Sequence, residues 1–314
     1  MSTLPVSVII PVFNGESTLE RCVRSINTGR RPQEIVIVDD KSKDGSVEMA
    51  KRLATTYGNI KVILRPMNGG AAEARRDGLY ATQCDYIAFV DADDYLEDGA
   101  LDDAYETLAE TGSDICILQL WRTEDGQESE FIDLGKVPFP ITGREAVELT
   151  LGSWSISALG VAKRTTYLKA YDGFSLKSMN ADELVSRLTF ANAEKVVTCK
   201  KRYFYVANPD STTKTFHPRY LTILDSDIWL LAFCKANGFN KYRETLRRSM
   251  SDLWHVFQNR NRLGIAEVRK KVRRFTFDVC FVAGFLPGIL REPKALLQFA
   301  LVAIYSRIPF SGKW

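Results

Sequence analysis

Histidine and paired cysteines are scarce in this chain of 314 residues. Only two histidines occur, His217 and His255, which excludes a metal site built from several histidines. The six cysteines are dispersed and none forms a C-x-x-C pair, so zinc ribbons and thioredoxin-like motifs have no support, and we expect free thiols in a reducing cytosol. The amino terminus has no basic segment before its short apolar run, and we expect no export signal.

A large excess of charge is also absent. The chain has 42 Lys and Arg against 39 Asp and Glu, a formal net charge of +3, which gives no reason to expect a nucleic-acid binder. Its 26% charged and 45% apolar residues are typical of a folded protein and argue against disorder. The length allows one large domain or two of ordinary size.

Apolar runs alternate with helical patterns over the first 120 residues. Such alternation predicts an α/β fold with an open parallel sheet joined by right-handed crossovers. The expected strands are residues 6–10, 34–40, 61–65, 86–94 and 114–118. The expected helices include 71–82, 99–111 and one that ends at Tyr57, for which Ser42, Asp44 and Ser46 are possible N-caps.

Polar residues lie at or after the ends of several of these strands, one of them directly before the glycine pair Gly69–Gly70. Ligands of open parallel sheets bind beyond the carboxyl ends of the strands, so these side chains should share one edge. Each could also be an ordinary turn residue, but their recurrence favours a site. The residues are Asn14, Asp39, Asp40, Asn68, Asp91, Asp93 and Asp94.

The rest of the chain is less regular. Residues 121–150 look irregular until a helical pattern begins after Thr142. A strand is possible within 152–164, and the sequence predicts a helix over 180–196 and a strand over 202–206.

Residues 5–211 resemble the family-two glycosyltransferases, which have the glycosyltransferase-A fold, a Rossmann-like nucleotide-binding sheet. Several motifs in the family's order carry the resemblance, and together they are far more specific than any one alone. They read PVSVIIPVFNGESTLERCVRSI, EIVIVDDKSKDGS, NGGAAEARRDGL, YIAFVDADDYL, NADELVSRL and YFYVANPDSTT. The resemblance implies inverting transfer of a sugar from a nucleotide-sugar to an acceptor hydroxyl.

The Asp91-Ala92-Asp93 segment is the expected metal site. A divalent cation, Mg or Mn, neutralises the charge that develops on a nucleoside diphosphate leaving group, and hard cations take oxygen ligands. The resemblance implies that Asp93 holds the metal and that Asp91 contacts ribose or metal, with Asp94 as a helper. The alternative is a solvated acidic turn.

The first two loops are expected to hold the nucleoside. A carboxylate can accept the imide N–H of uracil, and the resemblance places this acid at Asp39, with Asp40 either beside it or capping a helix. On the first loop the resemblance implies contacts from Pro11, Val12, Asn14 and Glu16.

A glycine-containing loop and the helix after it are the expected diphosphate side. Asn68, Gly69 and Gly70 let the backbone approach the donor, and the helix-entry N–H groups could face phosphate. Arg75 matches the arginine of the family's A-R-N motif. Arg76 replaces the usual asparagine, and we favour a surface role for it.

Inversion requires a general base opposite the leaving group. In the family this base belongs to an E-D pair at a helix start, and here the pair is reversed. Asp182 aligns with the family's catalytic aspartate, and Glu183 is the alternative candidate for the base. A helix-dipole role for either is also open.

Two ring residues have open roles. Trp154 could stack on an acceptor sugar or belong to the core. His217 could reach the metal or diphosphate, although a structural role is commoner for a lone histidine.

The carboxyl-terminal third is basic. Residues 241–314 contain 15 basic and 5 acidic residues, a net charge of +10, which leaves −7 for the first 240 residues. Neither of its apolar runs reaches the ~18 residues of a spanning helix. Basic helices beside short apolar runs suit an anionic membrane surface, but packing as a helical subdomain, oligomer contact and, least favoured, nucleic-acid binding are alternatives.

We therefore expect a catalytic domain over 1–215 and a helical, basic region over 216–314. The expected activity is metal-dependent transfer from a UDP-sugar or another nucleotide-sugar to a saccharide or lipid-linked saccharide in cell-surface polysaccharide synthesis, at the cytoplasmic face of the membrane. A nucleotide- or glycan-binding module without turnover and a nucleotidyltransferase are the alternatives.

Overall fold

The computed structural model describes residues 3–152, 154–172, 178–207 and 218–277. By its internal contacts the chain divides into two compact units. The first comprises residues 1–177 and 182–209, and the second comprises 178–181 and 210–314. Each unit has its own apolar core and is described separately below.

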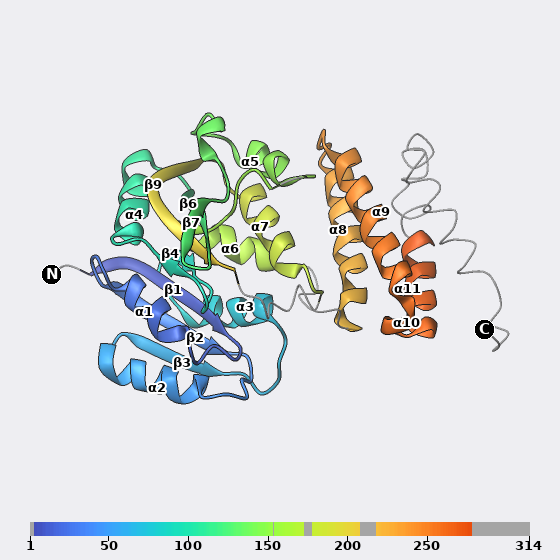
Figure 1. Ribbon diagram of the computed structural model, residues 1–314. Helices are drawn as coiled ribbons and strands as arrows, with labels where there is room; N and C mark the ends of the chain where they lie inside the picture. Colours follow the sequence, from blue (N-terminus) through green and yellow to red (C-terminus); the bar gives the residue numbers. More distant parts are fainter. Residues whose placement is uncertain (1–2, 153, 173–177, 208–217, 278–314) are drawn as a thin grey trace. The chain divides into compact units, whose positions relative to one another are not determined.

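Four parallel strands begin the sheet of the first unit, as the sequence predicts (Figure 1). They are β1 (Leu4–Val12), β2 (Pro32–Asp39), β3 (Ile60–Leu64) and β4 (Tyr86–Phe89), in the spatial order β3-β2-β1-β4. Buried β-branched side chains fill β1 and β2, since both faces of these strands are covered. The order reverses between β1 and β4, which makes their carboxyl ends the topological switch point of the sheet.

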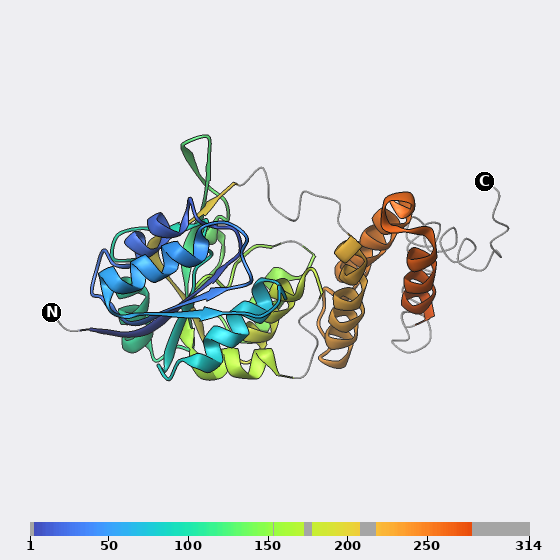
Figure 2. The same ribbon diagram turned by 90° about the horizontal axis from the view of Figure 1, so that it is seen from below.

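Helices cover both faces of this parallel sheet (Figure 2). The first three are α1 (Leu19–Ile26), α2 (Ser46–Tyr57) and α3 (Ala71–Ala81). Helix α3 approaches β1 closely at Gly78, where an added Cβ would lie 2.4 Å from a side-chain carbon of Ile9. Glycine at this position lets the helix pack directly on the strand.

The second half of the sheet is mixed, whereas the sequence predicts only its parallel half. Strand β8 (Gly160–Lys163) runs antiparallel between β4 and β6 (Ile115–Glu124), while β9 (Val196–Val206) runs parallel to β6. The two-residue β5 (Tyr95–Leu96) pairs with β9. Helix α4 (Ala100–Thr111) contacts β6 and β9.

Three predictions of local structure were wrong. The predicted strand over 86–94 ends at Phe89, because residues 91–94 turn and bond to β9. Residues 121–130 are not irregular, since β6 runs on to Glu124 and pairs with β7 (Gln127–Glu130). The predicted helix over 180–196 is α7 (Ala181–Ala191), and the valines at 196 and 197 instead pair with β6.

The remaining helices of the first unit are short. The helix expected after Thr142 is α5 (Gly143–Thr150), where Thr142 and Glu145 form a reciprocal capping box. Helix α6 (Arg164–Tyr171) was not predicted, and one 3₁₀ turn covers Leu134–Lys136.

The described part of the second unit is helical. A 3₁₀ turn (Pro218–Thr222) leads into α8 (Ile223–Ala236), α9 (Tyr242–Gln258), α10 (Arg260–Leu263) and α11 (Ile265–Phe277). These helices bury one shared core that includes Leu231, Met250, Leu253, Val268 and Val272. Among the described residues, no helix combines the length and apolar character needed to cross a bilayer. The apolar runs after residue 277 lie outside the described residues.

Candidate functional site

Interlocking hydrogen bonds join the loop after β1 to the loop after β2. Asn14 has a positive φ of 54°, and its backbone N–H donates to Ser42 Oγ at 2.9 Å. The side-chain oxygen of Asn14 accepts the backbone N–H of Lys43 at 2.8 Å. The Glu16 carboxylate accepts the Gly45 N–H at the start of α2, also at 2.9 Å. The Asn14 and Glu16 side chains therefore brace the first loop against the second.

The end of β1 holds the start of the second loop. Pro11 and Val12 are buried, and the Val12 carbonyl accepts the Asp40 N–H at 2.8 Å. Asp39, the last residue of β2, is only 3% exposed. Its Oδ2 accepts the Ser42 N–H at 3.1 Å, whereas its Oδ1 is buried and has no partner among the described residues. A buried acceptor of this kind costs free energy unless a ligand supplies the missing donor.

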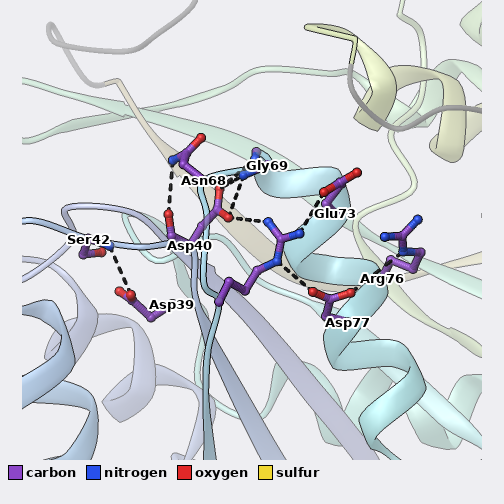
Figure 3. Close-up of polar contacts among 10 residues, drawn as sticks. Asp39, Asp40, Ser42, Asn68, Gly69, Glu73, Arg76 and Asp77 are labelled. Carbon is purple, nitrogen blue, oxygen red and sulfur yellow. Dashed lines mark hydrogen bonds and ion pairs between the residues drawn. The ribbon is translucent and has the colours of Figure 1, made fainter.

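The carboxylates of Asp40, Glu73 and Asp77, labelled in Figure 3, converge on one arginine side chain, that of Arg65. Arg65, only 7% exposed, forms ion pairs with Asp40, with Glu73 at 2.8 Å and with Asp77 at 2.7 Å. We call these four residues the Arg65 cluster. Sequence reasoning missed Arg65. The signal was an arginine directly after a strand, with two acids one helical turn apart on the next helix.

Asp40 also fixes the glycine-containing loop. Its carboxylate accepts the Gly69 N–H at 2.9 Å and the Gly70 N–H at 2.6 Å, and its carbonyl accepts from the Asn68 side chain at 3.2 Å. The N–H groups of Gly69 and Gly70 therefore bind a carboxylate of the protein. Asp40 holds loop 68–70 against the end of β2.

The Asp91–Asp94 segment, here called the acidic turn, is held by strand β9. The Tyr203 hydroxyl accepts the Asp91 N–H at 3.1 Å and donates to Asp94 Oδ2 at 2.8 Å, while Asp94 Oδ1 accepts the Val206 N–H at 2.8 Å. Burial, followed by the charge of Asp91, raises the pKa of Asp94 to about 8. Asp94 thus anchors the turn and leaves Asp91 and Asp93, both half-buried, at the edge of the sheet. Ala92 between them is buried.

Arg75 links the acidic turn to helix α7. Its guanidinium bonds to Asp91 Oδ1 at 2.5 Å and lies 5.9 Å from the centre of the Phe89 ring. Burial opposes its charge, but the carboxylates of Asp91 and Asp182 contribute to raising the pKa of Arg75. Arg76, by contrast, is about one-third exposed and approaches only Asp77, at 3.9 Å. That placement agrees with the surface role expected for Arg76.

The two candidate bases differ in their surroundings. Asp182 is exposed to solvent, yet protein atoms surround it densely enough that desolvation, the largest effect, raises its pKa against the opposing charge of Arg75. Glu183 instead forms an ion pair at 3.3 Å with the buried Arg187. The Arg187 guanidinium stacks 4.3 Å from the centre of the Trp154 ring and bonds to the Thr150 carbonyl. At least one face of Trp154 therefore packs on protein.

The donor set for a divalent cation consists of carboxylate oxygens on the acidic turn. Among the described residues, no three His, Cys, Asp or Glu side chains are grouped so as to form a metal site by themselves. Asp91 shares one oxygen with Arg75, and Asp94 is occupied by β9. The carboxylates of Asp91 and Asp93 are of the oxygen-donor type that a hard cation would take as ligands. His217 lies outside the described residues.

Comparison with known proteins supports one family. Residues 7–149 match the family model described as Glycosyl transferase family 2. A poly(ribitol-phosphate) beta-glucosyltransferase of Bacillus spizizenii is 36% identical over 121 residues, which span 37% of this chain and 19% of that protein. Poly(ribitol-phosphate) beta-N-acetylglucosaminyltransferase TarS of Staphylococcus aureus is 30% identical over 210 residues, 63% of this chain and 35% of the relative. The matches therefore span only a minor part of these relatives.

A solved structure shares the fold. The crystal structure of S. aureus TarS 1–349 in complex with UDP-GlcNAc aligns with a TM-score of 0.66 and 19% identity, over 96% of this chain and 90% of that one. This likeness agrees with the predicted α/β fold of glycosyltransferase-A type. Through residues 7–149, these findings support the predicted resemblance to the family-two glycosyltransferases.

Proposed function

We propose that this protein is an inverting glycosyltransferase that moves a sugar from a UDP-sugar to a saccharide or lipid-linked saccharide acceptor in cell-surface polysaccharide synthesis. One observation carries the proposal. The carboxyl edge of the sheet brings together an acceptor without a partner at Asp39, carboxylates at Asp91 and Asp93, and a carboxylate of raised pKa at Asp182. These groups correspond to base recognition, leaving-group stabilisation and proton removal.

The donor half of the site is assigned to the carboxyl ends of β1 and β2, where Asp39 lies. Asp39 Oδ1 accepts the imide N–H of uracil, which satisfies its buried lone pairs. A cytosine ring has no N–H at that position, so this contact favours uridine nucleotides. The TarS structure with UDP-GlcNAc supports a uridine donor for a protein of this fold.

The leaving diphosphate requires positive charge. A divalent cation held by Asp91 and Asp93 would supply Lewis-acid stabilisation of that charge. Arg75, already oriented by Asp91 and packed on Phe89, presents a permanent cation at the same edge. The paired Asp91 therefore keeps Arg75 directed toward the strand ends before donor binds.

The geometry favours Asp182 over Glu183 as the base. A general base works best when its pKa lies near the working pH, and desolvation moves Asp182 in that direction. Glu183 is instead held in an ion pair by the buried Arg187 at 3.3 Å, so its carboxylate is already engaged within the protein. Asp182 takes the proton of the acceptor hydroxyl as the new bond forms.

The identity of the released product tests the reaction class. Purified protein is incubated with Mg²⁺ or Mn²⁺, with a panel of UDP-, GDP-, ADP- and dTDP-sugars as donors and with simple methyl glycosides as acceptors. We expect release of UDP, stimulated by metal and lost in Asp93→Ala. In a parallel reaction supplied with UTP and a sugar 1-phosphate, release of pyrophosphate would indicate nucleotidyl transfer. UDP binding without any turnover would indicate a binding module, and metal-stimulated transfer unchanged in Asp93→Ala would contradict the metal assignment.

The second unit is proposed to bind the anionic cytoplasmic face of the membrane. Residues 241–314 have a net charge of +10, and the basic side chains Arg243, Arg247, Lys270, Arg273 and Arg274 are exposed on α9 and α11. Attraction to anionic lipid is worth roughly 1 kcal/mol per basic residue near the surface. Such docking places the enzyme beside a lipid-linked acceptor.

A charge-reversal variant of the full chain tests this proposal. Truncation at residue 240 is unsuitable because it would divide the core shared by α8, α9 and α11. We expect Lys270→Glu/Arg273→Glu/Arg274→Glu to lose co-sedimentation with vesicles of phosphatidylcholine and phosphatidylglycerol. The matched control reverses three exposed basic residues of the first unit: Lys51, Arg52 and Lys200. Equal binding by the two triple variants would contradict the assignment.

A further inference from the structure

Two exposed aromatic rings stack on each other near the acidic turn. Phe131, which directly follows β7, is 51% exposed, and Tyr205 of β9 is 37% exposed. Their ring centres lie 5.9 Å apart, and the ring planes differ by 13°. We call these residues the aromatic pair. Large rings left in water beside one another form an apolar patch of the kind that marks a binding surface.

The strand geometry directs Tyr205 to the site. Side chains alternate along a strand, so Tyr205 lies on the same face of β9 as Tyr203, two residues earlier. Tyr203 is the residue whose hydroxyl contacts the Asp91 N–H and the Asp94 carboxylate. Tyr205 is therefore the next side chain on that face toward the carboxyl end of the strand. Burial and then the charges of Asp94 and Asp93 raise its pKa, as expected beside the acidic turn.

A cation borders the aromatic pair. Arg122 of β6 is the register partner of Tyr205, so the two side chains share a face of the sheet. Its Nη2 pairs with Glu124 at 2.9 Å, while its Nε is buried and has no partner among the described residues. The β6–β7 hairpin that carries Arg122 projects beyond the rest of the sheet (Figure 2). The patch thus combines two ring surfaces with a hydrogen-bond donor that is not yet used.

We infer that Phe131, Tyr205 and Arg122 form the subsite for the sugar ring of the acceptor. This inference rests on the proposed glycosyl transfer and names the side from which the acceptor enters. The C–H face of a pyranose packs on aromatic rings, and its hydroxyl or acidic substituents accept from a guanidinium. An acceptor has to lie beside Asp93 and Asp94 in order to attack a donor sugar held at the acidic turn. The patch lies at that position, so we assign a saccharide acceptor as its occupant.

Direct binding of simple glycosides to the full chain tests the subsite. The probes are methyl β-D-glucopyranoside, methyl β-D-galactopyranoside and methyl N-acetyl-β-D-glucosaminide, titrated in saturation-transfer NMR with UDP and Mg²⁺ present. We expect the wild type to bind at least one of them. Phe131→Ala and Tyr205→Ala should each weaken that binding by about three- to tenfold, the effect of losing one aromatic contact. Tyr205→Phe should retain it.

The matched control is Tyr80→Ala, because Tyr80 is another exposed ring, 51% exposed, on helix α3. This variant should bind the glycoside as the wild type does. All variants should keep the wild-type UDP affinity and thermal midpoint, and Phe131→Gln replaces Phe131→Ala if the latter is unstable. Wild-type glycoside affinity in both alanine variants, or binding of none of the three probes by the wild type, overturns the subsite. Failure of the wild type to bind UDP instead contradicts the proposed function.

Discussion

The Arg65 cluster and the region around Asp91 and Asp182 both gather acids at the carboxyl edge of one sheet, but they satisfy them differently. In the Arg65 cluster, three carboxylates share one buried guanidinium, and Asp40 also accepts two glycine N–H groups. Near the acidic turn, Arg75 bonds to Asp91, while Asp182 is solvent-exposed and its pKa is raised. Satisfied acids hold loops in place, and acids with unused capacity remain available for chemistry.

The largest effect is expected at Asp182. Asp182→Asn removes the proton acceptor but keeps the shape of the side chain, and loss of a general base costs roughly 10²–10⁴ in kcat. The affinity for UDP should not change. The measurement is the rate of transfer from the UDP-sugar selected in the donor panel.

Glu183→Gln is the matched control for Asp182. Because Glu183 already forms an ion pair with Arg187, we expect Glu183→Gln to lose less than about tenfold in kcat. A larger loss in Glu183→Gln than in Asp182→Asn would exchange the two roles.

The pH dependence of the wild-type rate gives a further prediction. Because the pKa of Asp182 is raised, this carboxyl group loses its proton at a higher pH than an ordinary aspartate. The acid limb of the pH–rate profile should therefore lie above the ordinary aspartate pKa.

Removing the Arg65 guanidinium, which three carboxylates share, should strongly destabilise the folded protein. Arg65→Met leaves three carboxylates together without a buried partner, and breaking a buried ion pair in this way costs about 3–5 kcal/mol. The free energy of unfolding in urea measures this cost. Arg76→Met, on the same loop-and-helix segment but one-third exposed, should change the free energy by less than about 1 kcal/mol. Equal destabilisation by the two variants would refute the structural importance of Arg65.

Substitutions of the neighbouring acids Asp39 and Asp40 should have different effects, one mainly on UDP binding and the other mainly on stability. Asp40→Asn weakens the bonds to Arg65 and to the Gly69 and Gly70 N–H groups, so we expect the protein to lose about 1–3 kcal/mol of stability. Asp39→Asn replaces an acceptor that has an unused oxygen, so stability should change little, while UDP binding weakens by about 10- to 100-fold. Isothermal titration and urea unfolding of both variants measure the two effects. The reverse pattern would contradict the assignment of Asp39 to base recognition.

A satisfied acid far from the site gives the smallest effect. Asp114 accepts from Lys163 at 2.7 Å and from the Glu194 N–H at 2.7 Å. Burial raises its pKa, but these bonds prevail and lower the pKa. Because the folded pKa lies below the unfolded one, the stabilisation is present above the unfolded pKa and is lost as pH falls through the folded pKa. Asp114→Asn should cost about 1 kcal/mol at pH 7, and this cost should shrink in acid as the side chain of the wild type becomes protonated.

The pattern of the sequence was sufficient for the parallel half of the fold. Strands β1 to β4 are continuous apolar runs, and the helices between them have turn residues at their ends, so local chemistry and the final structure agree. The insertion of β8 between β4 and β6 could not be predicted, since a four-residue strand with a plain sequence acquires its neighbours only through long-range pairing. The same holds for the β6–β7 hairpin, whose second strand is entirely polar and exposed.

Residue types and spacing alone therefore determined which acids and glycines meet at the carboxyl edge, because parallel strands end together whatever their detailed packing. Only the tertiary structure decided how those residues are used. It placed Arg65 under Asp40, left one oxygen of Asp39 without a partner, and paired Glu183 with Arg187 while Asp182 stayed exposed. Burial and hydrogen-bond partners set the availability of each carboxylate, and both depend on contacts between residues far apart in the sequence.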